Sequence, residues 1–293
     1  MTIYNLGSIN VDHFYSVPHL PQPGETLAAC GYSTGLGGKG ANQSVAAAKA
    51  GAQVIHIGAV GPDGGDVLDR LALLGVDTTH VEQVDTPTAH AIINIDPAGE
   101  NAIVIFPGAN EKQSLTRLEL ALKDAGKGDI LLLQNETTLQ VEAAQMARKK
   151  GLFTIYSAAP FAAEAVTPIL PHIDLLVMNA VEAEQLTAAL SVPLTDTPVP
   201  HLLITRGKAG ATWRTQATGK DLHVPAFRVT PIDTTGAGDC YIGTVAAGLA
   251  ENLCAEDAMR RAAAASAIQV TRKGTADAIP TRDEVDSFLS THP

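Results

Sequence analysis

Short apolar runs alternate with longer segments of helical pattern along most of the chain. The apolar runs are too short for helices and are bounded by glycine or polar residues, which is typical of buried strands; they lie at 3–9, 54–60, 130–133, 152–156, 173–177 and 202–205. The longer segments predict helices at 41–50, 63–74, 138–150, 179–190, 242–250, 255–270 and 282–289. Because strands and helices alternate, we predict a three-layer α/β/α fold in which helices cover both faces of a largely parallel sheet.

One pair of apolar segments departs from this rhythm. Residues 89–95 and 102–106 alternate in polarity or are β-branched, and turn-forming residues 96–100 lie between them. This pattern predicts a β-hairpin. A hairpin inside a series of βα units favours an accessory sheet, such as a lid, over a strand of the main sheet. The chain carries no internal repeat, low-complexity tract or linker, so we predict a single domain over residues 1–293.

The composition narrows the partners that the protein could bind. The formal net charge is -11, whereas a nucleic-acid surface needs clustered Lys and Arg. The three cysteines, Cys30, Cys240 and Cys254, have no metal-ligand spacing, which favours a reducing compartment. The N-terminal residues lack the pattern of a signal peptide, and no apolar stretch approaches the roughly 20 residues of a membrane span. We therefore expect a cytoplasmic protein without nucleic-acid or membrane partners.

The most informative stretch is the glycine turn Asp233-Thr234-Thr235-Gly236-Ala237-Gly238-Asp239. An extended segment at 222–229 precedes it and a helical segment follows, so we predict a strand, a glycine turn and a helix start. The first N–H groups of a helix have no internal partners, and together with the helix dipole they form an anion site. Asp239 on this turn could act as a base toward a hydroxyl that attacks phosphorus. The competing interpretation is that Asp239 only caps the helix.

A second glycine-rich stretch, Gly35-Leu36-Gly37-Gly38-Lys39-Gly40, matches the GxGxxG pattern but lacks its context. A dinucleotide fingerprint opens the first βα unit, and a Walker A loop needs four residues between its glycines and a Ser or Thr after its lysine. We therefore disfavour a nicotinamide oxidoreductase. The stretch is better interpreted as a glycine loop that opens a helix, with Lys39 and Asn42 at its mouth, where glycines would let a flat polar ligand lie against the backbone.

Polar or glycine-rich clusters recur where predicted strands end. In α/β sheets ligands bind beyond the carboxyl ends of the strands, although Asn and Asp at such positions can also simply form turns. A shared edge would create a cleft for a substrate and a nucleotide. The clusters are Asn10 with Asp12, 38–42, Glu136, Asn179 with Glu182, 205–210 and 233–239.

Five motifs together resemble the ribokinase-like (PfkB) family of carbohydrate kinases, over essentially the whole chain. They are GSINVDH at 7–13, GGKGANQ at 37–43, Asn179-x-x-Glu182, DTTGAGD at 233–239 and TRKG at 271–274. The resemblance implies an ATP-dependent kinase that transfers the γ-phosphoryl group to the primary hydroxyl of a pentose, with D-ribose as the first choice. Fructose or another ketohexose, deoxyribose or a nucleoside are alternative acceptors. A non-enzymatic binding protein on the same fold is disfavoured because the motifs are intact.

The resemblance also implies roles for individual residues. Asp239 resembles the base that deprotonates the acceptor, and the amides of Gly236, Ala237 and Gly238 resemble the anion hole. Acceptor binding is implied for Asn10, Asp12, Gly38, Lys39, Asn42, Glu136 and Asp239. ATP binding is implied for Asn179, Thr205, Arg206, Gly207, Gly210 and Gly238. Glu182 is implied in holding Mg2+ with the phosphates, through water because Mg2+ keeps much of its hydration.

Two further features follow from the resemblance. A monovalent cation, K+ by preference, is implied beside the anion hole, and its ligands would be Asp233, Thr235, Gln269, Arg272 and Gly274. Ala278 stands where the family often supplies a further Ser ligand. A β lid would consist of parts of 12–40 and 88–107, and in this family such lids often pair in a homodimer.

Overall fold

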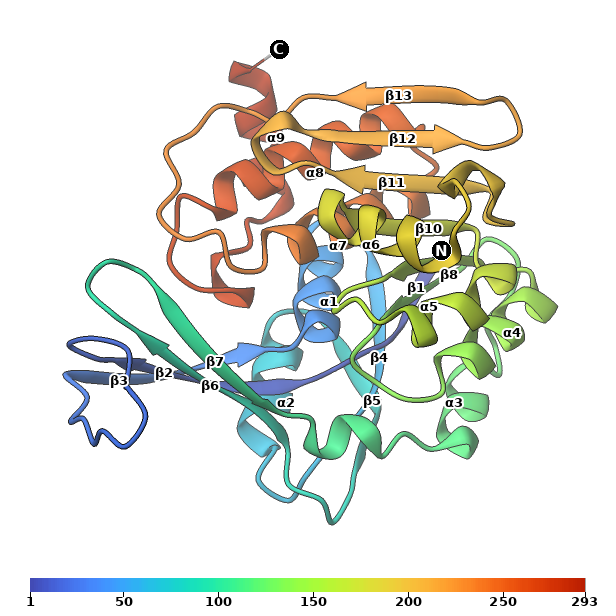
Figure 1. Ribbon diagram of the computed structural model, residues 1–293. Helices are drawn as coiled ribbons and strands as arrows, with labels where there is room; N and C mark the ends of the chain where they lie inside the picture. Colours follow the sequence, from blue (N-terminus) through green and yellow to red (C-terminus); the bar gives the residue numbers. More distant parts are fainter. Residues whose placement is uncertain (293) are drawn as a thin grey trace.

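The computed structural model describes residues 1–292, which contain a large and a small β-sheet (Figure 1). The large sheet has the order β13-β12-β11-β10-β9-β8-β1-β4-β5. Its strands are β1 (Thr2–Leu6), β4 (Gln53–Val60), β5 (Asp77–Gln83), β8 (Ile130–Gln134), β9 (Phe153–Ser157), β10 (Leu175–Asn179), β11 (His201–Thr205), β12 (Ala211–Thr215) and β13 (Lys220–Val224). Neighbours from β5 to β11 are parallel, and β12 and β13 form an antiparallel edge. The predicted, largely parallel sheet is confirmed.

Helices cover both faces of this sheet, because successive strand residues point to opposite sides. In β8, Ile130 and Leu132 join one core while Leu131 and Leu133 join the other. The first core is covered by α1 (Lys39–Lys49), α2 (Gly65–Leu73), α7 (Ala237–Ala250), α8 (Ala255–Gln269) and α9 (Arg282–Thr291). The second is covered by α3 (Leu115–Ala121), α4 (Gln140–Lys150), α5 (Ala163–Ile169) and α6 (Ala180–Leu190). The fold is therefore the predicted three-layer α/β arrangement.

The small sheet has the strand order β3-β2-β6-β7 and extends to the lower left of the main body in Figure 1. Its strands are β2 (Asn10–Ser16), β3 (Gly31–Gly37), β6 (Ala89–Ile95) and β7 (Asn101–Phe106). The hairpin predicted around residues 96–100 is confirmed as β6 and β7. Two expectations were wrong: Asn10 and Asp12 lie on strand β2 rather than in a loop after the first strand, and residues 31–37 form strand β3 rather than a loop.

A further expectation failed upstream of the glycine turn. Strand β13 ends at Val224, and residues 225–236 form neither helix nor strand, so no strand leads directly into the turn. Strand β5 and helices α3 and α5 were not foreseen, because they lack a long apolar run. Within residues 1–292, no helix combines the length and the apolar character needed to cross a membrane.

Candidate active site

Asp239 lies in the first turn of α7, and its side chain is buried. The helix begins after Gly236, which has a φ of 75° that favours glycine. The Asp239 carboxylate accepts a hydrogen bond from Nε2 of Gln43 at 3.0 Å and one from Nδ2 of Asn42 at 3.3 Å. Burial raises the pKa of Asp239. The nearby charge of Lys39 and these two hydrogen bonds lower it, but they offset the effect of burial only in part. The site thus holds a carboxyl group with increased proton affinity.

Backbone amides are available beside this carboxylate. No group within residues 1–292 accepts a hydrogen bond from the N–H of Gly236 or of Gly238. The N–H of Ala237 differs from the expectation, since it donates to the carbonyl of Thr234 at 3.3 Å. Two of the three predicted amides can therefore meet an anion directly, and the third only by giving up a long turn bond.

The predicted polar residues of α1 and the loop after β8 are joined by hydrogen bonds. The backbone N–H of Lys39 donates to Oε2 of Glu136 at 3.0 Å, and the hydroxyl of Ser8 donates to the same oxygen at 2.5 Å. Burial works to lower the pKa of Lys39, but Asp239, Glu136 and Glu182 outweigh it and raise the pKa above its usual value. Lys39 therefore stays protonated between carboxylates.

Asp12 is buried on β2, and it depends on a glycine of the neighbouring strand. A Cβ atom added at Gly37 would lie 2.1–2.2 Å from the carboxyl atoms of Asp12. Burial, and then the charge of Glu136, raise the pKa of Asp12 to about 7. Gly40 likewise meets the backbone of Gly7 and Ser8. Contrary to expectation, these glycines make room for the protein's own atoms rather than for a flat ligand.

The predicted nucleotide residues lie at the carboxyl ends of β10 and β11. Asn179 and Glu182 form a capping box at the start of α6: the Asn179 side chain accepts from the N–H of Glu182, and Glu182 Oε2 accepts from the N–H of Asn179 at 2.8 Å. Thr205 ends β11, and the following loop closes through a bond from the Arg206 N–H to the Gly210 carbonyl at 2.8 Å. Arg206 is exposed at this edge.

The loops at 233–235 and 272–274 meet through Asp233. Its carboxylate accepts from the N–H of Thr235 at 2.9 Å and from the N–H of Gly274 at 3.0 Å. Burial favours a higher pKa for Asp233, but these backbone bonds outweigh it and hold the pKa below its usual value. The side chain of Gln269 donates to the carbonyl of Thr235 at 3.1 Å, whereas the guanidinium of Arg272 pairs with Glu284. Hydrogen bonds thus connect Asp233, Thr235, Gln269 and Gly274.

A cleft of about 180 Å³ is lined by several of these groups. Its walls include Lys39, Asp239, Thr205 and 236–238 together with Asn179 and Glu182. The other predicted residues do not line this cleft; they are Asn10, Asp12, Gly38, Asn42, Glu136, Arg206, Gly207, Gly210, Asp233, Thr235, Gln269, Arg272 and Gly274. In the part of the chain that the structure describes, no three His, Cys, Asp or Glu side chains form a metal cage.

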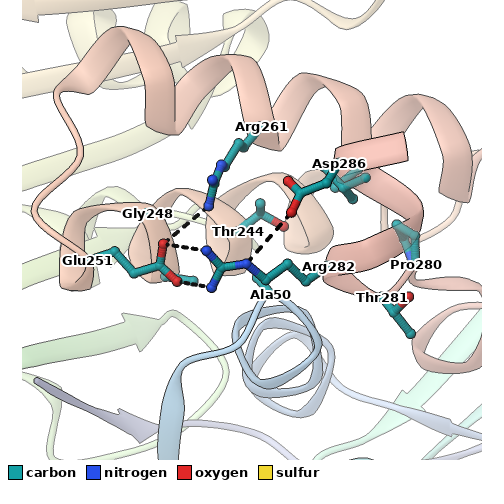
Figure 2. Close-up of a pocket in the computed structure, with 12 residues that line it drawn as sticks. Ala50, Thr244, Gly248, Glu251, Arg261, Pro280, Thr281, Arg282 and Asp286 are labelled. Atoms are coloured by element: carbon teal, nitrogen blue, oxygen red, sulfur yellow. Dashed lines mark hydrogen bonds and ion pairs between the residues drawn. The ribbon is translucent and has the colours of Figure 1, made fainter. Parts of the chain in front are cut away.

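A second cavity, of only about 20 Å³, lies between α7, α8 and α9, and none of the predicted residues lines it (Figure 2). Its charged groups neutralise one another: Glu251 pairs with Arg261 at 3.1 Å and with Arg282 at 2.5 Å, and Arg282 also approaches Asp286 at 3.8 Å. An internally paired set of this kind offers little attraction to a charged ligand. The first cleft is the candidate active site.

Sequence reasoning missed several buried polar residues around this cleft. Ser8 supports Glu136, and Asn110 donates from Nδ2 to Oδ1 of Asn10 at 2.8 Å. Gln43 donates a hydrogen bond to Asp239 and accepts one from Gln134. Ser8 and Gln43 fall inside the motifs at 7–13 and 37–43, which was a usable signal. Gln134 directly follows the predicted strand 130–133, which was also a usable signal, whereas nothing in the sequence singles out Asn110.

Comparison with known proteins gives a consistent answer. Residues 2–282 match the family described as pfkB family carbohydrate kinase. The chain is 39% identical to a ribokinase of Haemophilus influenzae over 98% of each chain, and 34% identical to a deoxyribokinase of Salmonella typhimurium over 99% of each. The structure of Arabidopsis thaliana ribokinase complexed with ribose and ATP superposes with a TM-score of 0.85 at 29% identity, covering 98% of each chain. The chain therefore belongs to the pfkB family of carbohydrate kinases.

Proposed function

We propose that this kinase transfers the γ-phosphoryl group of ATP to the primary hydroxyl of D-ribose, forming D-ribose 5-phosphate. The observation that carries the proposal is the buried Asp239 carboxylate beside the free amides at the start of α7, facing the same cleft as Lys39. Carboxylates and amides suit a polyol, because each can bond paired hydroxyls. The relatives named ribokinase favour ribose, and the deoxyribokinase relative makes deoxyribose the second candidate.

The proposed acceptor site would bind the sugar, and it would comprise Asn10, Asp12, Gly38, Lys39, Asn42, Glu136 and Asp239. Asp239 would take the proton of the primary hydroxyl as the oxygen attacks phosphorus. The amides of Gly236 and Gly238, joined by that of Ala237, would stabilise the charge that develops on the transferred group. Lys39, held protonated, lies where it can add to this stabilisation.

The nucleotide end would bind ATP; it consists of Asn179, Glu182, Thr205, Arg206, Gly207 and Gly210, with Gly238 shared. When bound, Mg2+ would bridge phosphate oxygens and neutralise their charge. One Glu182 oxygen is used by the capping box, so Glu182 would hold Mg2+ through water rather than as part of a protein cage. Backbone groups of the 206–210 loop would lie along the nucleotide.

A monovalent cation, K+ by preference, would bind between the loops at 233–235 and 272–274. Asp233 and the carbonyls of Thr235, Gln269, Arg272 and Gly274 form an oxygen donor set, which suits a hard cation. The carbonyl of Ala278 is approached by the Arg272 guanidinium at 3.4 Å, and we give it no part in the site. We expect a higher rate in K+ than in a bulky organic cation, and an equal rate would contradict the site.

We further propose that residues 1–293 act as one domain whose small sheet is a lid, and that two lids pair in a homodimer. Every residue of β7 is exposed, including Ile103, Val104, Ile105 and Phe106. An apolar strand of this kind at a sheet edge favours association. Sedimentation should give a dimer, and Val104→Asp should give a monomer. The three free cysteines are in keeping with the reducing cytoplasm.

The acceptor is tested by measuring ADP release with ribose, deoxyribose, fructose and nucleosides at equal concentration. We expect the highest kcat/KM with ribose and the next highest with deoxyribose. Activity confined to hexoses or nucleosides would overturn ribose while leaving the kinase reaction intact. No ADP release with any acceptor in the presence of Mg2+ and K+ would overturn the proposed reaction itself.

A further inference from the structure

A continuous chain of buried polar side chains runs from strand β4 to Asp239. Gln43 Nε2 donates to Asp239, and Gln43 Oε1 accepts from Gln134 Nε2 at 2.8 Å. Gln134 Nε2 also donates to Oδ1 of Asn5 at 2.9 Å. Asn5 Nδ2 donates to the hydroxyl of Ser44 at 2.8 Å, and Ser44 contacts His56 Nδ1 at 2.8 Å. The side chains behind Asp239 are at most 1% exposed: Asn5, Gln43, Ser44, His56 and Gln134.

The donor and the acceptor of each hydrogen bond in this series can be assigned, because the series ends at a backbone carbonyl, which can only accept. Asn5 Nδ2 lies 2.8 Å from the carbonyl of Gly40, so this atom must be the amide nitrogen and Asn5 Oδ1 must accept. Gln134 must then present its NH2 group to Asn5, and this same group meets Gln43. Gln43 must therefore turn its oxygen toward Gln134 and its NH2 group toward Asp239.

The contacts at the His56 end of this hydrogen-bonded series fix the same donors and acceptors independently. His56 Nε2 lies 3.1 Å from the carbonyl of Gly7, so Nε2 carries the hydrogen and Nδ1 accepts from the Ser44 hydroxyl. Burial lowers the pKa of His56 to about 4, which keeps the ring neutral and this tautomer in place. The Ser44 oxygen is then free to accept from Asn5, in agreement with the orientation derived from Gly40.

We propose that Gln43 is a positioning residue for the kinase reaction: its amide, locked by this chain, holds the Asp239 carboxylate in the orientation in which it meets the acceptor hydroxyl. The inference rests on the proposed role of Asp239 as the base. Gln43 donates to one carboxylate oxygen, and the bond of the other oxygen to Asn42 is longer. Each oxygen keeps a lone pair with which to accept the proton of the acceptor.

Packing between α1 and α7 keeps this contact short. A Cβ atom added at Gly243 would lie 2.3 Å from the carbonyl oxygen of Gln43, so the two helices touch through backbone just beyond the bond. Two other titratable groups act on Asp239, Lys39 from α1 and Glu136 from the loop after β8, and Asp239 in turn acts on the neighbouring Cys240. Burial raises the pKa of the Cys240 thiol to about 12, which keeps it uncharged at the pH of the assay.

The test compares Gln43→Met, which keeps the length and removes the amide, with the parent enzyme and its best acceptor. We expect kcat to fall on the order of 10- to 100-fold, the worth of a hydrogen bond to a charged group. The KM values for ATP and acceptor should stay within about threefold, because the substituted side chain meets Asp239 from behind rather than the substrates. Loss of the donor destabilises the ionised carboxylate, so the acid limb of the kcat/KM profile should move to higher pH.

A second variant and a matched control separate positioning from a structural effect. Gln43→Glu places a like charge beside Asp239, so it should move the acid limb further than Gln43→Met does. Gln216→Met makes the same chemical change at a remote site, where the amide donates to the carbonyl of Leu194 at 2.8 Å. It should leave kcat and the acid limb unchanged.

Three outcomes decide the proposal. The proposal is supported if the acid limb of the kcat/KM profile moves to higher pH in the order parent, Gln43→Met, Gln43→Glu. A limb that neither variant moves overturns it, even if both variants lose thermal stability or kcat. If Gln43→Met does not fold, the position of the limb in Gln43→Glu decides alone. An Asp239→Asn enzyme that remains active would instead overturn the proposed base, whereas an inactive Asp239→Asn with an unmoved limb rejects only Gln43.

Discussion

Most polar side chains of the proposed acceptor site are buried, whereas those of the proposed nucleotide site are half-buried or exposed. Asp12, Asn42 and Asp239 are 7%, 5% and 8% exposed, and each rests on further buried polar or glycine residues. Asn179 and Arg206 lie in the exposed class, and backbone bonds or a capping box hold their loops. One end is built from side chains within the core, and the other from backbone at the surface.

This difference separates two tasks. The buried carboxylates of Asp12 and Asp239 have raised pKa values, so the acceptor end should determine acceptor choice and pH dependence. Backbone amides and a hydrated metal can hold phosphate without much support from side chains. Substitutions at the acceptor end should therefore have larger effects than substitutions at the nucleotide end.

Replacing the base should give the largest effect. Asp239→Asn keeps the shape of the side chain but removes the proton acceptor, so we expect kcat to fall about 10²–10⁴-fold, the usual worth of a positioned base. The Kd values for ATP and acceptor, measured by calorimetry, should change little. A kcat within about threefold of the parent enzyme would remove Asp239 from this role.

Replacing Gly37, which leaves room for the Asp12 side chain, should have the next largest effect. In Gly37→Ala, the new Cβ would overlap the Asp12 carboxylate at 2.1–2.2 Å and displace it. We expect the KM for the acceptor to rise on the order of 10- to 100-fold, since hydrogen bonds to a charged group are lost. The KM for ATP should stay unchanged.

Gly35→Ala on the same strand is the matched control. Its new Cβ would approach only the ring of Phe14, at 3.3 Å, and that side chain can shift. Steady-state kinetics of both variants separates the loss of Asp12 from a general effect on β3. Equal KM values for the acceptor in the two variants would contradict the proposed role of Asp12.

The same contrast explains what could be predicted from the sequence. The nucleotide end is local: the Asn179–Glu182 capping box and the glycine turn are short motifs that the chain order displays directly. The alternation of strands and helices predicted the layers for the same reason, because each element has its own period.

The acceptor end could be predicted only in part, because its support comes from distant segments. Asn5, Gln134 and His56 are polar residues on strands, and in a one-dimensional pattern they resemble surface positions although they are fully buried. The strand that carries Asn10 and Asp12 was not foreseen, because β2 contains both polar and apolar residues. Strand β5 was missed for the related reason that it is an edge strand without an apolar run.

The pH dependence of acceptor binding tests the buried end without a substitution. The folded-state pKa of Asp12 is raised to about 7, so its carboxyl is mostly neutral below that pH and ionised above it. If the ionised form binds the sugar hydroxyls, Kd should rise about tenfold from pH 8 to pH 6, one decade per unit below the pKa. Calorimetry in buffers of different ionisation enthalpy should detect proton release on binding near pH 6. A Kd that is constant over this range would contradict the argument.

The smallest effect is expected at the exposed nucleotide end, for Arg206→Ala. The 206–210 loop closes through backbone bonds, and the Arg206 side chain makes no ion pair to any residue in 1–292. Its contribution to ATP binding should be that of a surface charge, so the KM for ATP should rise only two- to fivefold at low salt. This difference should shrink in 0.5 M salt, where screening is strong.

Lys208→Ala, at an exposed position of the same loop, is the matched control. A loss of more than about 30-fold in Arg206→Ala would mean that a side chain, rather than the backbone, holds the nucleotide, and the contrast between the two ends would fail.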